Sequence, residues 1–361
     1  MICSEIKFDE QKTMLQHLLK PLASAQIIDF WSKEFGLAFT WQRPTAKIVK
    51  RTVEANDTVS LWLKPNLRFK GFNAGQHINV TLQVNGVYFT RSYSLSDAPR
   101  TDGLLRITIK KDGKVSSHLC QHVHVGDSIE ISQAFGELQL NAQKPNLLLA
   151  SGSGITPLMS LLHTATMQQP TTLMYWAKNR ADLCFMAELN NLAAKNPLFK
   201  FYIFLTQEQN LLQGELKGRI DTQIITKLIP NLTQHQVIAC GGQGFIQAVE
   251  SLKPYVDTLQ VESFSPIKLN TPNTQLGTVR VELKASHKVL ELNQGDSLLD
   301  ALEAQGIYPP SGCRMGICHS CSCQKISGVT QDLQNGELVS ESQSAVKLCV
   351  NRAYSDLVLD I

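Results

Sequence analysis

The sequence predicts a multidomain protein in which an antiparallel β-barrel, an α/β domain and a small α+β domain follow a short helical segment. The chain has 361 residues, enough for two or three domains of roughly 150 residues each. The spacing of its apolar residues changes along the chain, and five of its nine cysteines lie beyond residue 312. With 43% hydrophobic and 18% charged residues, the composition is that of a folded chain and not of a disordered one.

Residues 1–42 predict the helical N-terminal segment. Their apolar residues recur at spacings of three and four, the repeat of one helix face. We expect this segment to pack on the barrel, although docking to a partner or a membrane surface is the alternative. The two apolar stripes consist of Met14, Leu15, Leu18, Leu19 and Leu22, and of Ile27, Ile28, Phe30, Trp31 and Phe35.

Residues 43–145 predict the antiparallel β-barrel. Short strands with alternating apolar residues, separated by turn residues, are expected at 59–63, 77–80, 105–109 and 129–131. Several short strands at such spacing are typical of antiparallel barrels.

Residues 146–265 predict the α/β domain, because apolar strands alternate there with helical stretches, the pattern of a parallel sheet flanked by helices. Residues 266–276 are polar and without periodicity, which indicates a linker. Residues 277–361 begin with an expected hairpin, 278–283 with 288–292, followed by a helix over 297–305 and a cysteine-rich loop.

Composition and patterning also exclude several classes of protein. The first residues lack the basic start and apolar stretch of a secretory signal, and no run approaches the ~18 apolar residues of a membrane-spanning helix. The formal net charge of +3 is not concentrated in basic runs interleaved with aromatics, so we expect no nucleic-acid partner. We expect a cytoplasmic protein, associated with a membrane at most through its partner.

The cysteine-rich loop gives the strongest chemical signal. Its spacing, C-x4-C-x2-C with a fourth cysteine 28 residues later, is that of plant-type 2Fe-2S ligation. Gly312 and Gly316 would let backbone amides wrap the cluster and donate hydrogen bonds to sulfur. A zinc site is the alternative, but zinc favours two short cysteine pairs. Cys323 is expected to be a buried filler, and the predicted ligands are Cys313, Cys318, Cys321 and Cys349.

With these ligands, residues 277–361 resemble a plant-type ferredoxin domain of the β-grasp class. The segment GCRMGICHSC, followed by GVTQDL and LCV, is similar to ferredoxin domains fused behind flavin reductases. The resemblance implies a carrier of one electron at a time.

Two segments of the expected barrel predict a flavin site. Arg91 could hold a flavin oxygen or the pyrophosphate, Tyr93 could stack on the isoalloxazine, and Ser94 could bond near N5. This R-x-Y-S sequence resembles the flavin signature of the ferredoxin–NADP reductase superfamily. The segment GKVSSHL, with Lys114, Val115 and Ser116, follows where that superfamily has its second phosphate loop, which favours FAD over FMN.

The expected α/β domain contains a loop suited to a nicotinamide cofactor. The segment SGSGITP lies between an expected apolar strand and an expected helix. A dinucleotide-binding domain binds the pyrophosphate of its cofactor at such a turn. Gly152 and Gly154 would let the backbone approach the phosphates. The G-x-G-x-T-P sequence resembles the nicotinamide loop of the same superfamily, which implies that Thr156 lies near the nicotinamide or the flavin.

Two later segments resemble other parts of that superfamily. Cys240 and Gly241 resemble the C-G-P segment, whose cysteine lies beside the position of hydride transfer, although here a glycine replaces the proline. A buried thiol without a chemical role is the alternative for Cys240. Phe264 ends a Glu-Ser-Phe sequence that resembles the E-x-F end of the domain, where the aromatic ring can cover the flavin. Lys178 and Arg180 could meet a 2′-phosphate, which favours NADPH slightly over NADH.

Together, these resemblances imply an NAD(P)H:acceptor oxidoreductase. Electrons would pass from NAD(P)H through FAD and the 2Fe-2S cluster to an external redox protein. The expected catalytic residues are Tyr93, Ser94, Thr156 and Cys240.

The order of the modules and the segments LLKPLASAQIIDFW and RSYSLSDAP resemble reductase partners of membrane-bound acyl-CoA and fatty-acid desaturases. This favours a di-iron desaturase as acceptor and leaves open a peripheral contact with a membrane-bound partner. A Rieske-type or other multicomponent oxygenase is the alternative acceptor. A non-catalytic redox sensor is the alternative from another class.

Overall fold

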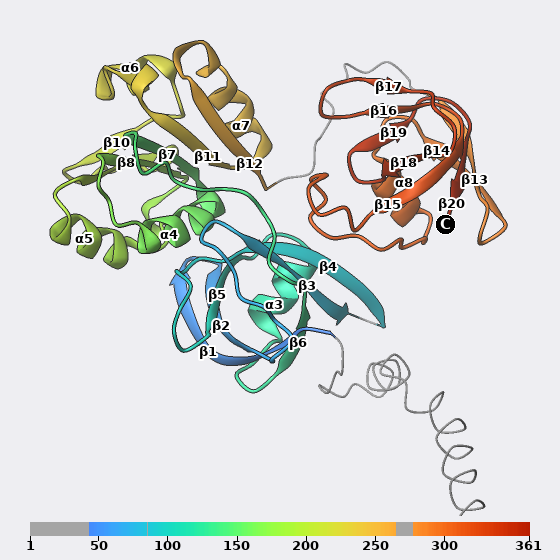
Figure 1. Cartoon of the computed structure of the whole chain (residues 1–361), viewed down its shortest axis with the longest axis horizontal. Coiled ribbons are helices and arrows are strands. Elements are labelled where there is room, and N and C mark those ends of the chain that lie inside the picture. The colour runs from blue at the N-terminus through green and yellow to red at the C-terminus, as the bar shows by residue number, and fades with distance from the viewer. Residues whose placement is uncertain (1–42, 85, 265–276) are drawn as a thin grey trace, which may run out of the picture.

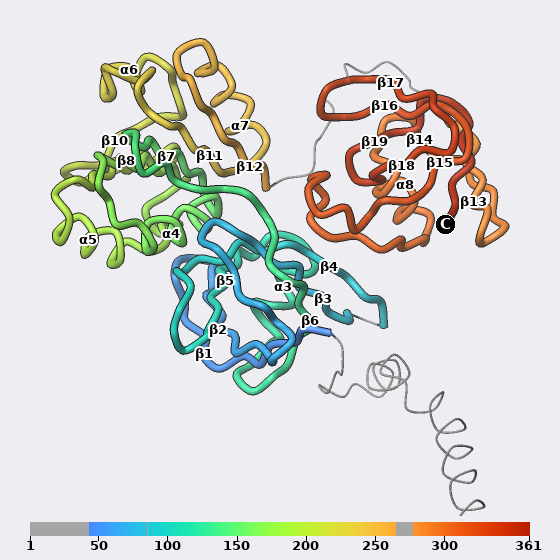
Figure 2. The backbone as a smooth tube through the Cα atoms, viewed as in Figure 1, coloured from blue at the N-terminus to red at the C-terminus, as the bar shows by residue number. Residues whose placement is uncertain are grey.

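The computed structural model describes residues 43–84, 86–264 and 277–361, whose strands form three groups (Figure 1). The predicted helical segment 1–42 and the predicted linker 266–276 lie outside the described residues. In Figures 1 and 2 the first domain, which carries β1 to β6, lies between the second domain (β7 to β12) and the third (β13 to β20).

The first domain is an antiparallel six-stranded sheet with one helix. Its strand order is β4-β3-β6-β1-β2-β5, and inward-facing residues such as Ile48, Leu61 and Ile78 form its core. The edge strands β4 and β5 meet at one bridge between Leu95 and Ile107. The predicted antiparallel β domain is confirmed, and this bridge is where the sheet approaches the closure expected of a barrel. Its elements are β1 (Thr45–Ala55), β2 (Thr58–Pro65), β3 (His77–Val84), β4 (Val87–Ser94), β5 (Leu105–Lys110), α3 (Lys114–Gln121) and β6 (Ser128–Ile131).

The second domain has a parallel sheet in the order β10-β9-β8-β7-β11-β12, which confirms the predicted α/β fold. Alternate residues of β7 face opposite sides: Leu148 packs in one core with helices α4 and α5, and Leu149 packs in another with α6 and α7. Its elements are β7 (Asn146–Ser151), α4 (Ile155–Thr164), β8 (Thr171–Ala177), α5 (Met186–Lys195), β9 (Phe199–Leu205), β10 (Glu215–Lys217), α6 (Thr222–Leu228), β11 (Gln236–Gly241), α7 (Gln243–Glu250) and β12 (Thr258–Ser263).

Two details of this domain differ from the sequence prediction. The apolar pattern predicts a helical stretch over 183–194, but helix α5 begins at Met186, because Phe185 adopts a left-handed φ of 61°, a conformation that a helix cannot continue through. Strand β10 and helix α6 were not predicted, since three to seven residues are too few to show a periodicity.

The third domain combines a five-stranded sheet, β14-β13-β20-β15-β18, with a three-stranded one, β17-β16-β19. The predicted hairpin and helix are present, and the helix packs its buried leucines against the sheet. The side chain of Ser297 caps the helix by accepting the N–H of Asp300. Its elements are β13 (Thr278–Leu283), β14 (Lys288–Asn293), α8 (Leu298–Ala304), β15 (Ser322–Ser327), β16 (Thr330–Asp332), β17 (Leu338–Val339), β18 (Ser344–Lys347), β19 (Asn351–Ala353) and β20 (Leu357–Asp360).

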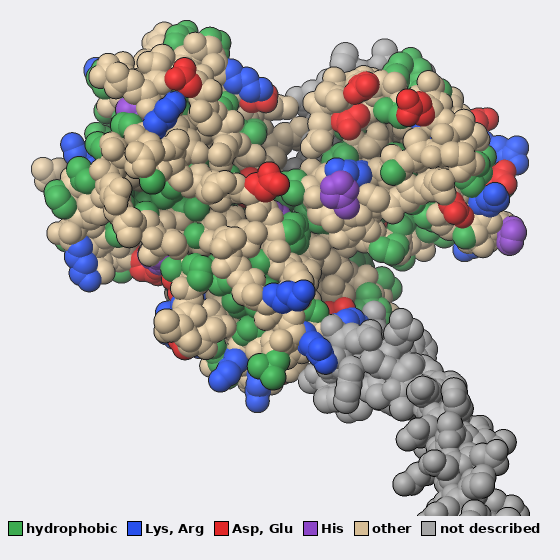
Figure 3. Space-filling model, in the orientation of Figure 1, with side chains coloured by type: hydrophobic (Ala, Val, Ile, Leu, Met, Phe, Trp, Pro, Cys, Tyr) green, Lys and Arg blue, Asp and Glu red, His purple; other side chains and the backbone are tan. Residues whose placement is uncertain are grey.

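Charged side chains are unevenly distributed over the face that Figure 3 shows. Acidic side chains gather on the third domain near β16 and β17, and basic ones gather along the lower part of the first domain. Within the described residues, no helix is long and apolar enough to cross a membrane.

Candidate functional site

A cavity of about 430 Å³ lies where residues of all three domains meet. A site of this size is large enough for part of a cofactor. The first domain contributes the end of β4, the start of α3 and His77. The second domain contributes four residues, Ser153, Thr156, Glu262 and Phe264, and the third contributes Cys313, Arg314, Met315 and Ile317.

The predicted flavin signature lines this cavity from strand β4. Arg91, Tyr93 and Ser94 all face it. Burial and the neighbouring Arg314 guanidinium lower the pKa of Arg91, so an anionic ligand would relieve repulsion there. Burial raises the pKa of Tyr93 above its ordinary value, so the phenol stays neutral, as a stacking ring requires.

The predicted second phosphate loop also lies on the cavity. Gly113 precedes α3 with a φ of 95°, which a residue with a side chain rarely adopts. Lys114, Val115 and Ser116 line the cavity at the first turn of the helix, where backbone amides are free to bind an anion. The hydroxyl of Ser116 donates to the carbonyl of Asp112 at 2.7 Å, so it holds the loop as well as facing the cavity.

The predicted nicotinamide loop forms a short turn, Gly152–Gly154, between β7 and α4. Gly154 is packed against the backbone of β11: a Cβ atom there would lie 1.9 Å from the carbonyl oxygen of Cys240. Thr156 lines the cavity, and its hydroxyl donates to the carbonyl of Ser153 at 2.9 Å. The glycines therefore bring the loop against the sheet, and Thr156 faces the flavin residues.

Cys240 lies behind the cavity and is not among the residues that line it. Its side chain is 0% exposed, and burial raises the pKa of its thiol well above the ordinary value. Gly241 accepts the backbone N–H of Phe264 at 2.8 Å, which holds the Phe264 ring at the cavity wall. The predicted hydride-transfer role of Cys240 stays a prediction, and the structure places Phe264 nearer to the cavity.

Two cavity residues were missed by the sequence prediction. Burial raises the pKa of Glu262 to about 7, so this carboxyl can give or take a proton near neutral pH. Burial lowers the pKa of His77 to about 4, and its Nε2 has no hydrogen-bond partner among the residues that the structure describes. Glu262 begins the Glu-Ser-Phe sequence, but that motif assigned it no role, and His77 lies in none of the motifs; only the tertiary structure buries both residues at the cavity.

Arg180, one of the two candidates for a 2′-phosphate, is already paired. Its guanidinium donates to both carboxylate oxygens of Glu215 at 2.7 Å and to the carbonyl of Asn210. Lys178 is exposed. The predicted preference for NADPH, which stays a prediction, would therefore depend on Lys178 more than on Arg180.

The four predicted cluster ligands lie in two pairs. The backbone N–H of Cys313 donates to Sγ of Cys318 at 3.1 Å, and the N–H of Cys318 donates to Sγ of Cys313 at 3.3 Å. The Sγ atoms of Cys321 and Cys349 are 3.1 Å apart. Four thiols in two pairs, with amides directed at sulfur, fit a cluster of two irons. Cys323 is half-buried and packs against the core of the domain.

The cluster loop contains residues other than glycine that adopt a positive φ. Gly316 has a φ of 78°, as the sequence suggested, but Arg314 and His319 also have positive φ, 60° and 56°. Such conformations cost energy and are found where function requires a fixed geometry. Arg314 is held by ion pairs to Asp300 and Glu303 of α8.

The fold and the site define a class: a modular redox protein with a flavin site, a nicotinamide site and an iron–sulfur site. Family models match each module, by the descriptions "Oxidoreductase FAD-binding domain" over residues 45–140, "Oxidoreductase NAD-binding domain" over 148–251 and "2Fe-2S iron-sulfur cluster binding domain" over 281–353. FAD, a nicotinamide dinucleotide and a 2Fe-2S cluster are therefore its cofactors.

Relatives place the chain in its family. It is 34% identical over 322 residues to an NADPH oxidoreductase of Mycobacterium tuberculosis, covering 85% of this chain and 82% of that protein. It is 29% identical to the ferredoxin reductase component of a 3-ketosteroid-9-alpha-monooxygenase of the same species, covering 74% of this chain and 78% of that protein. The chain belongs to the ferredoxin reductase-type oxidoreductases that carry FAD-binding, NAD-binding and 2Fe-2S domains.

A solved structure shares the whole architecture. Phthalate dioxygenase reductase superposes with a TM-score of 0.61 at 24% identity, covering 88% of this chain and 97% of that one. At this identity the likeness concerns the fold, and it extends over all three modules. The architecture thus agrees with that of a ferredoxin reductase-type oxidoreductase with three modules.

Proposed function

We propose that the protein delivers single electrons to a separate iron-containing, oxygen-activating enzyme. The observation that carries the proposal is the cavity shared by the three domains, where the flavin signature, Thr156 and the cluster-loop residue Cys313 lie together. This arrangement supports a continuous route from NAD(P)H through FAD to the cluster.

The residues around the cavity have distinct proposed roles. Arg91, Lys114 and the backbone at Val115 and Ser116 bind the flavin phosphates, and Tyr93 and Ser94 orient the isoalloxazine. Gly152, Gly154 and Gly241 let the nicotinamide cofactor approach, and Thr156 positions its ring. A flavin held by these residues would supply the chemistry that takes up a two-electron hydride and gives up electrons singly, and Cys313, Cys318, Cys321 and Cys349 would hold the cluster that receives them.

Two classes of protein are candidates for the electron acceptor. Several relatives are named as monooxygenase reductase components, among them a glycine betaine monooxygenase reductase subunit of Pseudomonas aeruginosa, 24% identical over 351 residues. This favours the terminal component of a multicomponent oxygenase. A di-iron fatty-acid desaturase remains the second candidate, supported by the segment RSYSLSDAP at the end of β4.

An anaerobic titration with NADPH tests the redox function. A reductase should show bleaching of the flavin absorbance followed by loss of the visible absorbance of the cluster. A flavin that NADPH and NADH both fail to bleach would contradict the proposal and favour a redox sensor.

Reconstitution with purified acceptors then separates the two candidates. Turnover with an oxygenase component and none with a desaturase in vesicles would identify the first candidate, and the reverse result would identify the second. Turnover of an artificial dye serves as the control for an active reductase in both assays. Failure with both acceptors while the dye is reduced would contradict an oxygen-activating acceptor.

A further inference from the structure

Strand β3 of the flavin-binding domain contacts the cluster loop through one amide side chain. Asn79 lies on β3 and is only 9% exposed. Its Nδ2 donates to Oγ of Ser320 at 3.4 Å, across the boundary between the flavin-binding and ferredoxin-type domains. Its Oδ1 accepts a hydrogen bond from the hydroxyl of Ser92. One buried side chain therefore joins the flavin signature to the cluster loop.

The position of Asn79 is fixed by its own domain. Its backbone N–H donates to Oγ of Ser132 at 2.9 Å, and its backbone pairs with Ser92 in the β3–β4 ladder. The amide therefore reaches the cluster loop from a rigid sheet and not from a flexible loop, which is what accurate positioning requires.

On the other side of the boundary, Ser320 belongs to the cluster loop and follows the predicted ligand Cys318 by two residues. Sγ of Cys318 and Oγ of Ser320 lie 2.7 and 3.0 Å from the position that a Cβ atom at Gly312 would take, so the two side chains are neighbours. Contacts beside a ligand sulfur orient the ligands of a cluster. The chain of contacts thus runs from Ser92 through Asn79 to Ser320, which lies beside Cys318.

Gly312 makes this convergence possible. A Cβ atom at Gly312 would lie 2.7 Å from Sγ of Cys318, 2.9 Å from Nδ2 of Asn79 and 3.0 Å from Oγ of Ser320. All three distances are shorter than a carbon atom tolerates. The sequence places a glycine in the cluster loop. The structure shows that Asn79 of the neighbouring domain lies where a side chain at Gly312 would otherwise be.

We propose that Asn79 is a positioning residue for electron transfer between the flavin and the cluster. By donating to Ser320 it holds the thiol of Cys318 against the flavin-binding domain, so that the cluster receives each electron in one fixed arrangement. This inference rests on the proposed function, because it requires a flavin that reduces the cluster. A first one-electron transfer from the reduced flavin would convert one ferric ion of the cluster to ferrous. The cluster would return to its oxidised form by passing that electron to the acceptor, and a second transfer of the same kind would then return the flavin to its oxidised form.

The test is stopped-flow mixing of the full-length holoenzyme with NADPH in the absence of oxygen. The first phase reports flavin reduction, and the second reports cluster reduction. In Asn79→Ala we expect the ratio of the second rate constant to the first to fall about fivefold, the factor that corresponds to the loss of one neutral hydrogen bond. Asn79→Asp should have a similar effect, since a carboxylate cannot donate to Ser320 and would draw its hydroxyl away from Cys318.

Two further variants separate positioning from a general weakening of the fold. Ser320→Ala should lower the ratio as Asn79→Ala does, and Ser320→Thr, which keeps the hydroxyl, should restore it. Asn66→Ala is the matched control: Asn66 donates to the carbonyl of Arg43 within the flavin-binding domain at 3.1 Å, and among the described residues its side chain hydrogen-bonds to none of the cluster loop. We expect Asn66→Ala to leave the ratio at the wild-type value.

The outcomes are distinguishable. An unchanged ratio in folded Asn79→Ala, with cofactor content at the wild-type level, would overturn the proposal. An equal fall in Asn66→Ala would do so as well, since it would indicate a general effect on the domain. A wild-type enzyme whose cluster NADPH does not reduce would instead contradict the proposed function.

Discussion

The flavin-binding domain meets its two neighbours through contacts of different chemistry. Toward the nicotinamide-binding domain it presents a network of charges around Arg106, which is 4% exposed and makes two hydrogen bonds to Glu188, at 2.8 and 3.0 Å. Toward the ferredoxin-type domain the described contacts include a neutral hydrogen bond from Asn79 and an edge-to-face pair of Phe89 and Tyr308.

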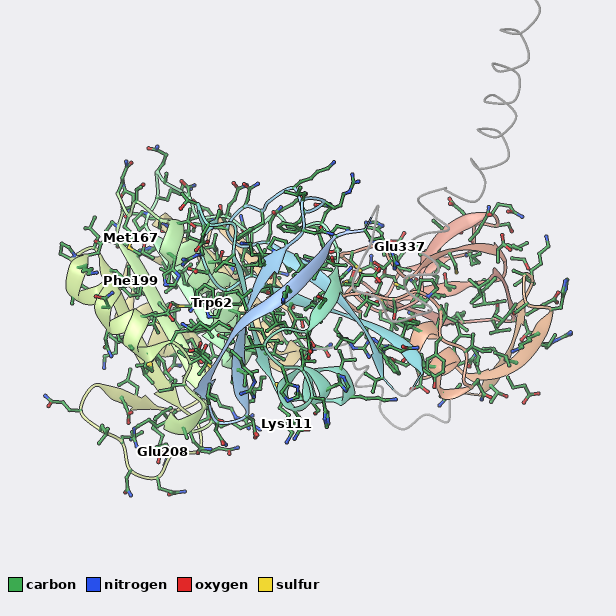
Figure 4. All side chains as sticks on the ribbon, turned by 90° about the horizontal axis from the view of Figure 1, so that it is seen from below. Trp62, Lys111, Met167, Phe199, Glu208 and Glu337 are labelled. Atoms are coloured by element: carbon green, nitrogen blue, oxygen red, sulfur yellow. The ribbon has the colours of Figure 1, made fainter. Side chains whose placement is uncertain are left out.

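The charged interface is built from several elements. His163 of α4 lies 2.9 Å from Asp97 and 3.1 Å from Glu188. The guanidinium of Arg106 also lies 5.2 Å from the ring centre of Trp62 and 4.9 Å from that of Phe185, and Figure 4 shows Trp62 where the two domains meet.

The difference between the two interfaces affects how firmly each neighbouring domain is held. Buried, hydrogen-bonded ion pairs are costly to separate, so the flavin and nicotinamide sites keep a fixed geometry for hydride transfer. Neutral contacts are weaker. We therefore expect the ferredoxin-type domain to be held less strongly than the nicotinamide-binding domain.

The largest expected effect comes from removing a cluster ligand, which separates flavin reduction from electron transfer through the cluster. Cys318→Ser removes one cluster ligand, so we expect electron transfer through the cluster to be abolished while NADPH still bleaches the flavin. Reduction of cytochrome c or of the natural acceptor, measured beside anaerobic flavin bleaching, checks this. Loss of flavin bleaching in the folded variant would show that hydride transfer to the flavin depends on the cluster.

A substitution in the charged interface tests how strongly the nicotinamide-binding domain is held. Arg106→Met leaves Glu188 without its guanidinium partner, and we expect stability to fall by about 2–3 kcal/mol, less than for a fully buried pair because Glu188 is 34% exposed. Thermal unfolding followed by flavin release measures the change.

The matched control for Arg106 is Arg100→Met. Arg100 also lies over Trp62, at 5.3 Å, but its partner Asp102 is at the exposed surface. We expect a much smaller shift in the unfolding midpoint. Equal shifts for the two variants would argue that Arg106 contributes through its contact with Trp62 and not through the ion pairs.

The charged interface should also depend on pH. Burial opposes protonation of His163, but hydrogen bonds to Asp97 and Glu188 outweigh it and raise its pKa to about 9 from 6.5. A raised pKa stabilises the folded state fully below pH 6.5, and this contribution is lost as the pH rises through 9. We expect a loss of about 2 kcal/mol over this window, allowing for the partly exposed carboxylates.

Calorimetry between pH 6.5 and 9.5 measures this dependence. His163→Gln should flatten the decline of the unfolding midpoint, while His235→Gln, at an exposed loop position, should leave the slope as in the wild type. A wild-type slope in folded His163→Gln would show that another group titrates.

The smallest expected effect concerns the neutral interface. Tyr308→Ala removes the pair with Phe89, whose ring centres are 6.1 Å apart, and such a contact contributes about 0.5–1 kcal/mol. We expect cluster reduction to slow about two- to fivefold with an unchanged unfolding midpoint. Tyr354→Ala, with the same exposure of 50% on the same domain, is the control. A fall in the unfolding midpoint as large as that of Arg106→Met would contradict the contrast between the interfaces.

The sequence by itself predicted the three modules and, at the site, the short motifs that supply part of the cavity lining. Cys313, Cys318 and Cys321 could be predicted as ligands because their spacing is a local property of the chain. The flavin signature at Arg91 and the loop at Gly152 were predictable for the same reason, since each motif lies within a few residues at the end of a strand.

Only the tertiary structure decided which of these groups share one cavity. His77, Glu262 and Arg314 reach the cavity from three domains. The burial that shifts the pKa of His77 and of Glu262 comes from neighbours distant in sequence. Cys240 lies behind the cavity because β11 is covered on both faces. A short motif specifies its own backbone and chemistry, whereas contacts such as that of Asn79 with Ser320 exist only once separate domains have packed together.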